Sequence, residues 1–124
     1  MATQQTTASP INGIDFTTYL VKNLERAISF YRDTLGLTVT KSFGSDFAEF
    51  TFADGTTLAL DKQEGWLEGN VVNFGVSDIR FAVDLYKERG VKFHNDGEVF
   101  ETAVCFVALA RDSEGNSFML HQRK

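Results

Sequence analysis

One stretch of sequence occurs twice in this chain of 124 residues, and this internal repeat constrains the fold more than any other feature. Residues 21–31 (VKNLERAISFY) align without gaps with residues 76–86 (VSDIRFAVDLY), and Val, Ala and Tyr recur at identical places. The match resumes downstream, where residues 54–60 (DGTTLAL) resemble residues 114–120 (EGNSFML). Self-similarity of this kind indicates two copies of one supersecondary unit that bury a core together.

The first part of each copy has the pattern of a helix that follows a strand. Asn23 and Asp78 are side chains that accept hydrogen bonds from the first free N–H groups of a helix. Gly36 and Gly90 fall where a left-handed residue commonly ends one. Between these signals, apolar residues recur at helical spacing: Leu24, Ile28, Tyr31 and Leu35 in the first copy, and Ile79, Val83 and Tyr86 in the second.

The second part of each copy resembles a hairpin turn followed by an alternating strand. We therefore predict an α+β fold of two βαβββ modules that form a curved mixed sheet. The modules cover about residues 13–63 and 70–124, after a flexible N-terminus over residues 1–12. The expected strands are 14–21, 37–43, 46–53, 57–62, 70–76, 91–95, 103–111 and 116–122, and the expected helices are 24–35 and 78–89.

Composition narrows the classes of partner. A net charge of −5 argues against nucleic acid and anionic membranes, and no apolar run approaches the length of a transmembrane helix. The first ten residues lack the basic start and apolar centre of a signal peptide, so we expect a cytoplasmic protein. Cys105 is the single cysteine, without a neighbouring base, and we expect it to be a small buried hydrophobe.

Strand alternation sorts the side chains onto two faces of the sheet. The apolar set is expected to pack under the helices: Tyr19, Val21, Leu58, Leu60, Val72, Phe74, Val76, Phe118 and Leu120. The other set mixes polar and apolar groups: Phe16, Thr18, Leu20, Thr57, Ala59, Asp61, Val71, Asn73, Gly75, Ser117, Met119 and His121. A mixed face is typical of a ligand pocket, although antiparallel sheets also present such faces to water. The large apolar groups Phe16, Val71 and Met119 favour the pocket.

The repeat resembles a known family. Residues 20–31, followed by Leu35, Gly36 and Leu37, look like the opening helix of the vicinal oxygen chelate superfamily of glyoxalases, bleomycin-resistance proteins and extradiol dioxygenases. Residues 111–116 (RDSEGN) resemble the family's Asp-Pro-x-Gly-Asn turn, with Ser113 in place of the proline. The resemblance implies a glyoxalase-like fold whose concave face holds a site enclosed by the two modules.

The resemblance also implies positions for a divalent metal. Carried over from the helix starts and hairpin turns, these positions fall on Phe16, Ala59, Val71 and Met119. None of the four is a ligand for Zn²⁺, Mn²⁺, Ni²⁺ or Fe²⁺, which prefer imidazole and carboxylate donors. We expect no metal and no other cofactor, which argues against the Lewis-acid chemistry of family glyoxalases.

The remaining candidates each allow two interpretations. His121 either contacts a ligand as a donor, acid or base, or is an exposed histidine. Asp61 either pairs with a ligand cation or with His121, or is merely solvated. Asn73 is either a hydrogen-bonding partner of a ligand or a structural amide. Trp66 either stacks on flat ligands at the pocket mouth or packs against the sheet edge. His94 is expected at the surface.

The leading hypothesis is a metal-free small-molecule-binding protein, similar to bleomycin-resistance relatives, that takes an aromatic or cationic ligand on the concave face. Its expected ligand-binding residues are Phe16, Thr18, Ala59, Asp61, Trp66, Val71, Asn73, Met119 and His121. The alternatives are a glyoxalase-like lyase, isomerase or dioxygenase with a non-standard set such as Asp61 and His121, or a non-catalytic assembly subunit. We expect a homodimer, because one chain would expose apolar sheet edge and concave surface.

Overall fold

The computed structural model describes residues 9–63, 65–67 and 69–124. These residues form one mixed sheet with two main helices, which confirms the predicted α+β class and the glyoxalase-like curved sheet. The elements of the first module are β1 (Ile11–Val21), α1 (Leu24–Ser29), the π-helical segment η1 (Phe30–Thr34), β2 (Lys41–Phe43), β3 (Phe47–Thr51) and β4 (Thr57–Lys62). Those of the second are β5 (Asn70–Val76), α2 (Ile79–Glu88), β6 (Lys92–Phe93), the 3-10 turn η2 (His94–Gly97), β7 (Phe100–Glu101), β8 (Cys105–Arg111) and β9 (Ser117–Arg123).

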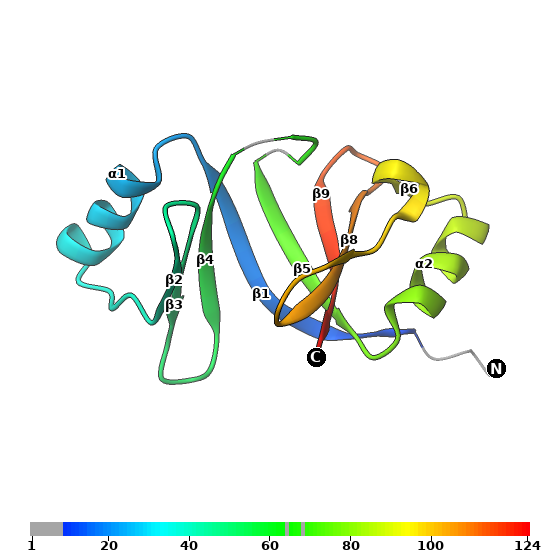
Figure 1. The fold of residues 1–124 in the computed structure, drawn as a ribbon, viewed down its shortest axis with the longest axis horizontal. Coiled ribbons are helices and arrows are strands. Elements are labelled where there is room, and N and C mark those ends of the chain that lie inside the picture. The colour runs from blue at the N-terminus through cyan, green and yellow to red at the C-terminus, as the bar shows by residue number, and fades with distance from the viewer. Residues whose placement is uncertain (1–8, 64, 68) are drawn as a thin grey trace.

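The two modules meet at the centre of the sheet. The strand order is β2-β3-β4-β1-β5-β9-β8-β6, with β7 paired to β8. β1 runs parallel to β4, β5 runs parallel to β9, and β1 and β5 pair antiparallel where the modules join. Helices α1 and α2 therefore lie at opposite ends of the molecule with the sheet between them (Figure 1).

Both helices begin where the sequence predicts. The side chain of Asn23 accepts a hydrogen bond from the backbone N–H of Arg26 at 3.0 Å, and Asp78 accepts one from the N–H of Phe81 at 3.1 Å. Gly36 and Gly90 have φ of 75° and 87°, the left-handed conformation that glycine adopts without strain. The first helix continues beyond Ser29 as η1, a wider turn that the helical spacing does not distinguish from an ordinary helix.

Several strand boundaries differ from prediction. β2 begins at Lys41 rather than at residue 37, because Leu37 and Val39 pack against the core beside α1. β6 ends at Phe93, since Asn95 and Asp96 adopt left-handed conformations that break the strand.

The N-terminal boundary is also different. Residues 1–8 of the expected flexible N-terminus lie outside the described residues. Ile11 and Asn12, which we assigned to that segment, are instead the first residues of β1. Ile11 pairs with Val76 and packs against the core under α2, which explains why the strand starts early.

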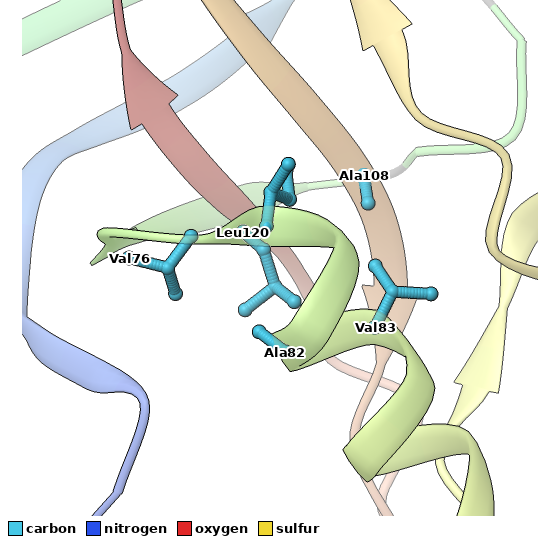
Figure 2. Packing of buried hydrophobic residues seen from close by; sticks show 6 residues of the cluster. Val76, Ala82, Val83, Ala108 and Leu120 are labelled. Atoms are coloured by element: carbon cyan, nitrogen blue, oxygen red, sulfur yellow. The ribbon is translucent and has the colours of Figure 1, made fainter.

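Each helix covers its own hydrophobic cluster. Figure 2 shows the cluster under α2, where Ala82 and Val83 of the helix meet Val76, Ala108 and Leu120 of the sheet. The cluster under α1 centres on Leu24, Phe50 and Leu60. Burying a leucine as fully as Leu60 or Leu120 contributes about 1.5–3 kcal/mol.

Most of the predicted apolar face lies in these two clusters, namely Val21, Leu58, Leu60, Phe74, Val76, Phe118 and Leu120. Tyr19 and Val72 were expected with them but belong to neither cluster, and Tyr19 is 40% exposed. Tyr19 lies on β1 and Val72 on β5, the two central strands between the regions that the helices cover. Of the described helices, none has the length and apolar character needed to cross a membrane.

Candidate ligand-binding site

A cavity of about 650 Å³ lies on the mixed face of the sheet, on the side away from the two core clusters. Small-molecule sites commonly have volumes of about 300–1,000 Å³. The lining residues come from both modules: Asp15, Phe16, Thr18, Lys41, Phe43, Phe47, Glu49, Thr57, Asp61, Thr102, Ala103, Val104, Cys105, Val107, Met119, His121, Arg123 and Lys124. The sheet thus presents a hollow large enough for a ring system.

The walls of the cavity are largely apolar. Phe43 and Phe47 of the β2–β3 hairpin lie with ring centroids 5.5 Å apart on the side of the first module. Val104 and Val107 line the side of the second module, and Val104 is 57% exposed. Cys105 is buried and free, as expected, and it too contributes to the cavity wall.

Asp15 enters the cavity through a bulge in β1, which the sequence analysis missed. Ile14 pairs with Phe74 and Phe16 pairs with Asn73, so Asp15 is an extra residue without an opposite partner on β5. A bulge interrupts strict alternation and allows consecutive residues to share a face. Asp15 and Phe16 consequently both line the cavity. The one hint in the sequence is Gly75, because glycine inside a strand often marks a bulge or a close approach.

The Asp15 carboxylate holds His121 in place. Oδ2 lies 2.7 Å from His121 Nδ1, while Oδ1 lies 3.1 Å from Arg123 Nη1. The His121 side chain is 8% exposed and that of Asp15 is 19% exposed. The ring of Phe16 meets the imidazole edge to face, with centroids 5.1 Å apart and an interplanar angle of 86°. Among the interpretations of His121, a freely exposed histidine is therefore excluded.

Asn73 is a buried residue that supports the β1 side of the site through hydrogen bonds. It is fully buried, and its Nδ2 donates to the carbonyl of Phe16 at 3.1 Å and to Thr18 Oγ1 at 3.0 Å. Within the described residues, its Oδ1 is the one fully enclosed side-chain oxygen or nitrogen that has no hydrogen-bond partner. Asn73 pairs with Phe16 on one side and with Met119 on the other, so it sets the spacing of these two lining residues.

The structure divides all but one of the expected binding residues into two groups. The residues that line the cavity are Phe16, Thr18, Asp61, Met119 and His121. Ala59 of β4 and Val71 and Asn73 of β5 pair with lining residues of β1 but are themselves buried, each with at most 1% exposure. Trp66 belongs to neither group.

Trp66 packs on the second module, away from the cavity lining. The guanidinium of Arg111 lies 4.1 Å from its ring centroid and also donates to the Trp66 carbonyl at 2.5 Å. The ring of His94 lies 5.2 Å from Trp66, so His94 is half-buried rather than at the surface as expected. A ligand in the cavity would not touch the Trp66 ring, which makes its fluorescence a poor reporter of binding there.

The charges that line the cavity are balanced. Three carboxylates, those of Asp15, Glu49 and Asp61, oppose three cations, those of Lys41, Arg123 and Lys124. Arg123 pairs with Asp15, and Lys124 pairs with Glu101 at 2.6 Å. The net charge of −5 is therefore not concentrated at the cavity.

The residues present do not fit a divalent metal. The four positions that the family resemblance points to carry a phenyl, a methyl, an isopropyl and a thioether group, namely Phe16, Ala59, Val71 and Met119. None offers a nitrogen or oxygen donor, which first-row divalent metals require. Nowhere in the described ranges do three or more His, Cys, Asp or Glu side chains gather as a metal site would require.

The fold and cavity define a two-module domain with a cavity lined by both modules. The model of the Glyoxalase/Bleomycin resistance protein/Dioxygenase superfamily matches residues 13–120, and the chain belongs to this superfamily. The resemblance inferred from the repeat is thereby confirmed. No curated protein matches the chain.

Three solved structures share the fold at low sequence identity. Methylmalonyl-CoA epimerase from Mycobacterium tuberculosis is 17% identical, with a TM-score of 0.71 over 97% of this chain and 93% of its own. A superfamily member from Vibrio splendidus 12B01 is 19% identical, with a TM-score of 0.66 over 88% of this chain and 97% of its own. The hypothetical protein BH1468 from Bacillus halodurans C-125 is 19% identical, with a TM-score of 0.69 over 90% and 94%. These similarities support the fold alone.

Proposed function

We propose that the protein binds a small aromatic molecule on the concave face of its sheet without the help of a metal. The observation that carries the proposal is the cavity of about 650 Å³ with largely apolar walls, in which the Asp15 carboxylate holds His121 beside Phe16. Pockets for small molecules combine apolar walls with a few polar groups that orient the ligand. The rings of Phe16, Phe43 and Phe47 can each stack on a flat ligand, at about 0.5–1.5 kcal/mol beyond area burial.

The same cavity offers features that attract an aromatic cation. Phenyl rings attract a cation that lies over their face, and Glu49 lies on the β3 wall beside Phe47. Lys41 opposes this attraction at the same edge. We therefore rank neutral aromatic compounds first and aromatic cations second.

The proposal is tested by NMR titration of the uniformly ¹⁵N-labelled protein with three matched naphthalenes: 2-methoxynaphthalene (neutral), 2-(aminomethyl)naphthalene (cationic) and 2-naphthoate (anionic). We expect the amide signals of Phe16, Phe43 and Met119 to shift with the neutral compound, and less strongly with the cationic one. Changes confined to residues around Trp66, or no change with any compound at millimolar concentration, would contradict the proposal.

A second candidate is a lyase or isomerase that transfers a proton without a metal. The specific observation in its favour is the Asp15–His121 pair at the cavity wall, because a histidine fixed by a carboxylate is a common general base. This set replaces the pair of Asp61 and His121 that the sequence suggested. The test is His121-dependent exchange of solvent deuterium into an aryl ketone with acidic α-hydrogens, followed by mass spectrometry, and equal exchange by His121→Phe would exclude it.

The remaining alternative, a subunit kept for assembly alone, is not favoured. Such a protein has no need of a cavity, and here the cavity is large enough to admit a ring system.

A further inference from the structure

We propose that the ligand of this cavity is a phenol, a hydroxyl-bearing aromatic compound that donates its O–H to Nε2 of His121. The inference rests on the proposed function and adds the chemical group that the site recognises. It follows from the tautomer of His121, from the surroundings of Nε2 and from the ring beside it.

Asp15 fixes the tautomer of His121. An ionised carboxylate only accepts hydrogen bonds, so the 2.7 Å contact with Oδ2 requires a proton on Nδ1. Oδ1 of the same carboxylate lies 3.1 Å from Arg123 Nη1, so both of its oxygens have a partner. In the neutral imidazole the second nitrogen then carries a lone pair. In the neutral ring, His121 Nε2 is therefore a hydrogen-bond acceptor.

Nε2 is available to a ligand. No described side chain or backbone group forms a hydrogen bond with it. In the described part of the chain, Asn73 Oδ1 is the one side-chain oxygen or nitrogen that is both fully enclosed and without a partner. The unpartnered Nε2 is therefore not fully enclosed. The imidazole lines the cavity and is otherwise buried, with 8% of its side chain exposed. The free acceptor thus opens toward the cavity, where a ligand donor satisfies it and a ligand acceptor is repelled by its lone pair.

The apolar surroundings of the imidazole favour a ligand whose donor group is attached to an aromatic ring. Phe16 meets the imidazole at 5.1 Å, Val107 pairs with His121 across β8 and β9, and Met119 lies two residues before it on the same face. All three line the cavity. A hydroxyl attached directly to a ring reaches Nε2 while the ring rests on these apolar groups.

A free acceptor at Nε2 predicts different affinities for two ligands that differ only in a hydrogen-bond donor. 2-Naphthol donates a hydrogen bond, whereas 2-methoxynaphthalene has the same ring system and cannot. Loss of one ligand hydrogen bond that leaves a protein acceptor unpaired weakens binding by roughly 10- to 100-fold. We expect the wild-type protein to bind 2-naphthol at least tenfold more tightly than its methyl ether, as measured by isothermal titration calorimetry.

Two variants separate recognition from a structural role. His121→Phe keeps a ring but removes the acceptor, so both naphthalenes should bind equally. Asp15→Asn replaces the carboxylate with an amide that can donate to Nδ1, which moves the imidazole proton to Nε2 and makes that atom a donor. This variant should lose the preference for 2-naphthol and bind the acceptor 2-acetylnaphthalene more tightly than the wild type does. A purely structural pair would weaken all three ligands alike.

His94→Phe is the matched control, because His94 is the other histidine of the chain and lies outside the cavity lining. It should keep the tenfold preference, and circular dichroism should show all variants folded. Equal affinity of the wild type for 2-naphthol and its methyl ether, or a preference that persists in His121→Phe, would overturn the phenol proposal while leaving aromatic binding intact. Absence of binding by every naphthalene would overturn the proposed function itself.

Discussion

The carboxylate of Asp15 lies directly over the backbone of Gly75. A Cβ at position 75 would come within 2.5 Å of Asp15 Oδ1, closer than side-chain carbons approach other atoms. Glycine inside a strand is less stable than alanine by about 0.5–1 kcal/mol, yet here its missing side chain leaves room for the group that holds His121. Gly75, Asp15 and His121 therefore depend on one another.

Gly75→Ala should displace the Asp15 carboxylate and break its hydrogen bond to His121. Because the carboxylate is the end of a side chain, we expect the fold to persist with a loss of about 1–3 kcal/mol in the free energy of unfolding. Urea denaturation measures the loss, and the imidazole signals of His121 in NMR spectra report the broken contact.

Gly13→Ala is the control for this change, since Gly13 also lies on β1 and nothing lies within 4 Å of a Cβ built there. We expect its stability to stay within about 0.5 kcal/mol of the wild type. Equal effects of the two substitutions would contradict the proposed dependence of Asp15 on Gly75.

The purified protein should hold no stoichiometric divalent metal. The expected metal positions carry only apolar side chains, Phe16, Ala59, Val71 and Met119, which provide no hard donor. Elemental analysis after purification without a chelator measures the content. One firmly bound Zn, Ni, Mn or Fe per chain would show that the donors lie elsewhere in the protein.

The sequence predicted the fold because its signals are local and repeated. Helix starts at Asn23 and Asp78 depend on residues close in the chain, and the duplicated pattern gave the order of elements twice. The boundaries it missed have tertiary causes. Ile11 extends β1 because it packs under α2, a contact that joins residues distant in sequence.

The site was predicted where it depends on local alternation along a strand and was missed where it depends on pairing between strands. Parity placed Phe16, Met119 and His121 on one face, and all three line the cavity. Alternation fails at the β1 bulge, so the candidate partners of His121 included Asp61 but not Asp15. A bulge depends on the register between two strands, which periodicity in one strand does not contain.

The turn between β8 and β9 should lose stability at low pH. Hydrogen bonds from the Asn116 side chain and from backbone N–H groups hold the pKa of Asp112 below its ordinary value of 3.8. The unfolded chain therefore binds the proton more readily, so this stabilisation is present above pH 3.8 and is lost as pH falls through the lower pKa of the folded state. Asp112→Ala should lower the melting temperature at pH 7 and have little further effect at pH 2.

Asp84→Ala is the control, since Asp84 is an exposed carboxylate on α2 for which the described residues provide no hydrogen bond. Its melting temperature at pH 7 should not fall. A drop for Asp112→Ala that is equally large at pH 2 and pH 7 would mean that the turn does not depend on the ionised carboxylate.

We expect a homodimer. Large apolar side chains remain exposed, among them Ile14 at 61% on β1 and Phe43 at 48% on the edge strand β2. Exposed sheet edges and apolar groups are commonly covered by a second copy of the chain. Light scattering at micromolar concentration should give twice the chain mass of 13.8 kDa. A monomer mass would contradict the prediction.

The last prediction concerns the two apolar residues that flank the fully buried Asn73. Phe16→Glu and Met119→Glu should each leave the protein folded and weaken the binding of 2-methoxynaphthalene at least tenfold. Both side chains line the cavity, where a new carboxylate stays in contact with water in the free protein but loses that hydration when an apolar ring covers it. Calorimetry measures the affinity and circular dichroism the fold.

Phe74→Glu provides the contrast, because Phe74 lies between Asn73 and Gly75 on the opposite face and packs against the cluster under α2. There the same carboxylate packs against apolar side chains, and the cluster holds no cation to pair with it, so we expect this variant to unfold. If Phe16→Glu and Met119→Glu unfold while Phe74→Glu stays folded, the two faces of the sheet have been assigned the wrong way round. If both cavity variants stay folded and bind the naphthalene as tightly as the wild type, the ligand site lies outside this cavity.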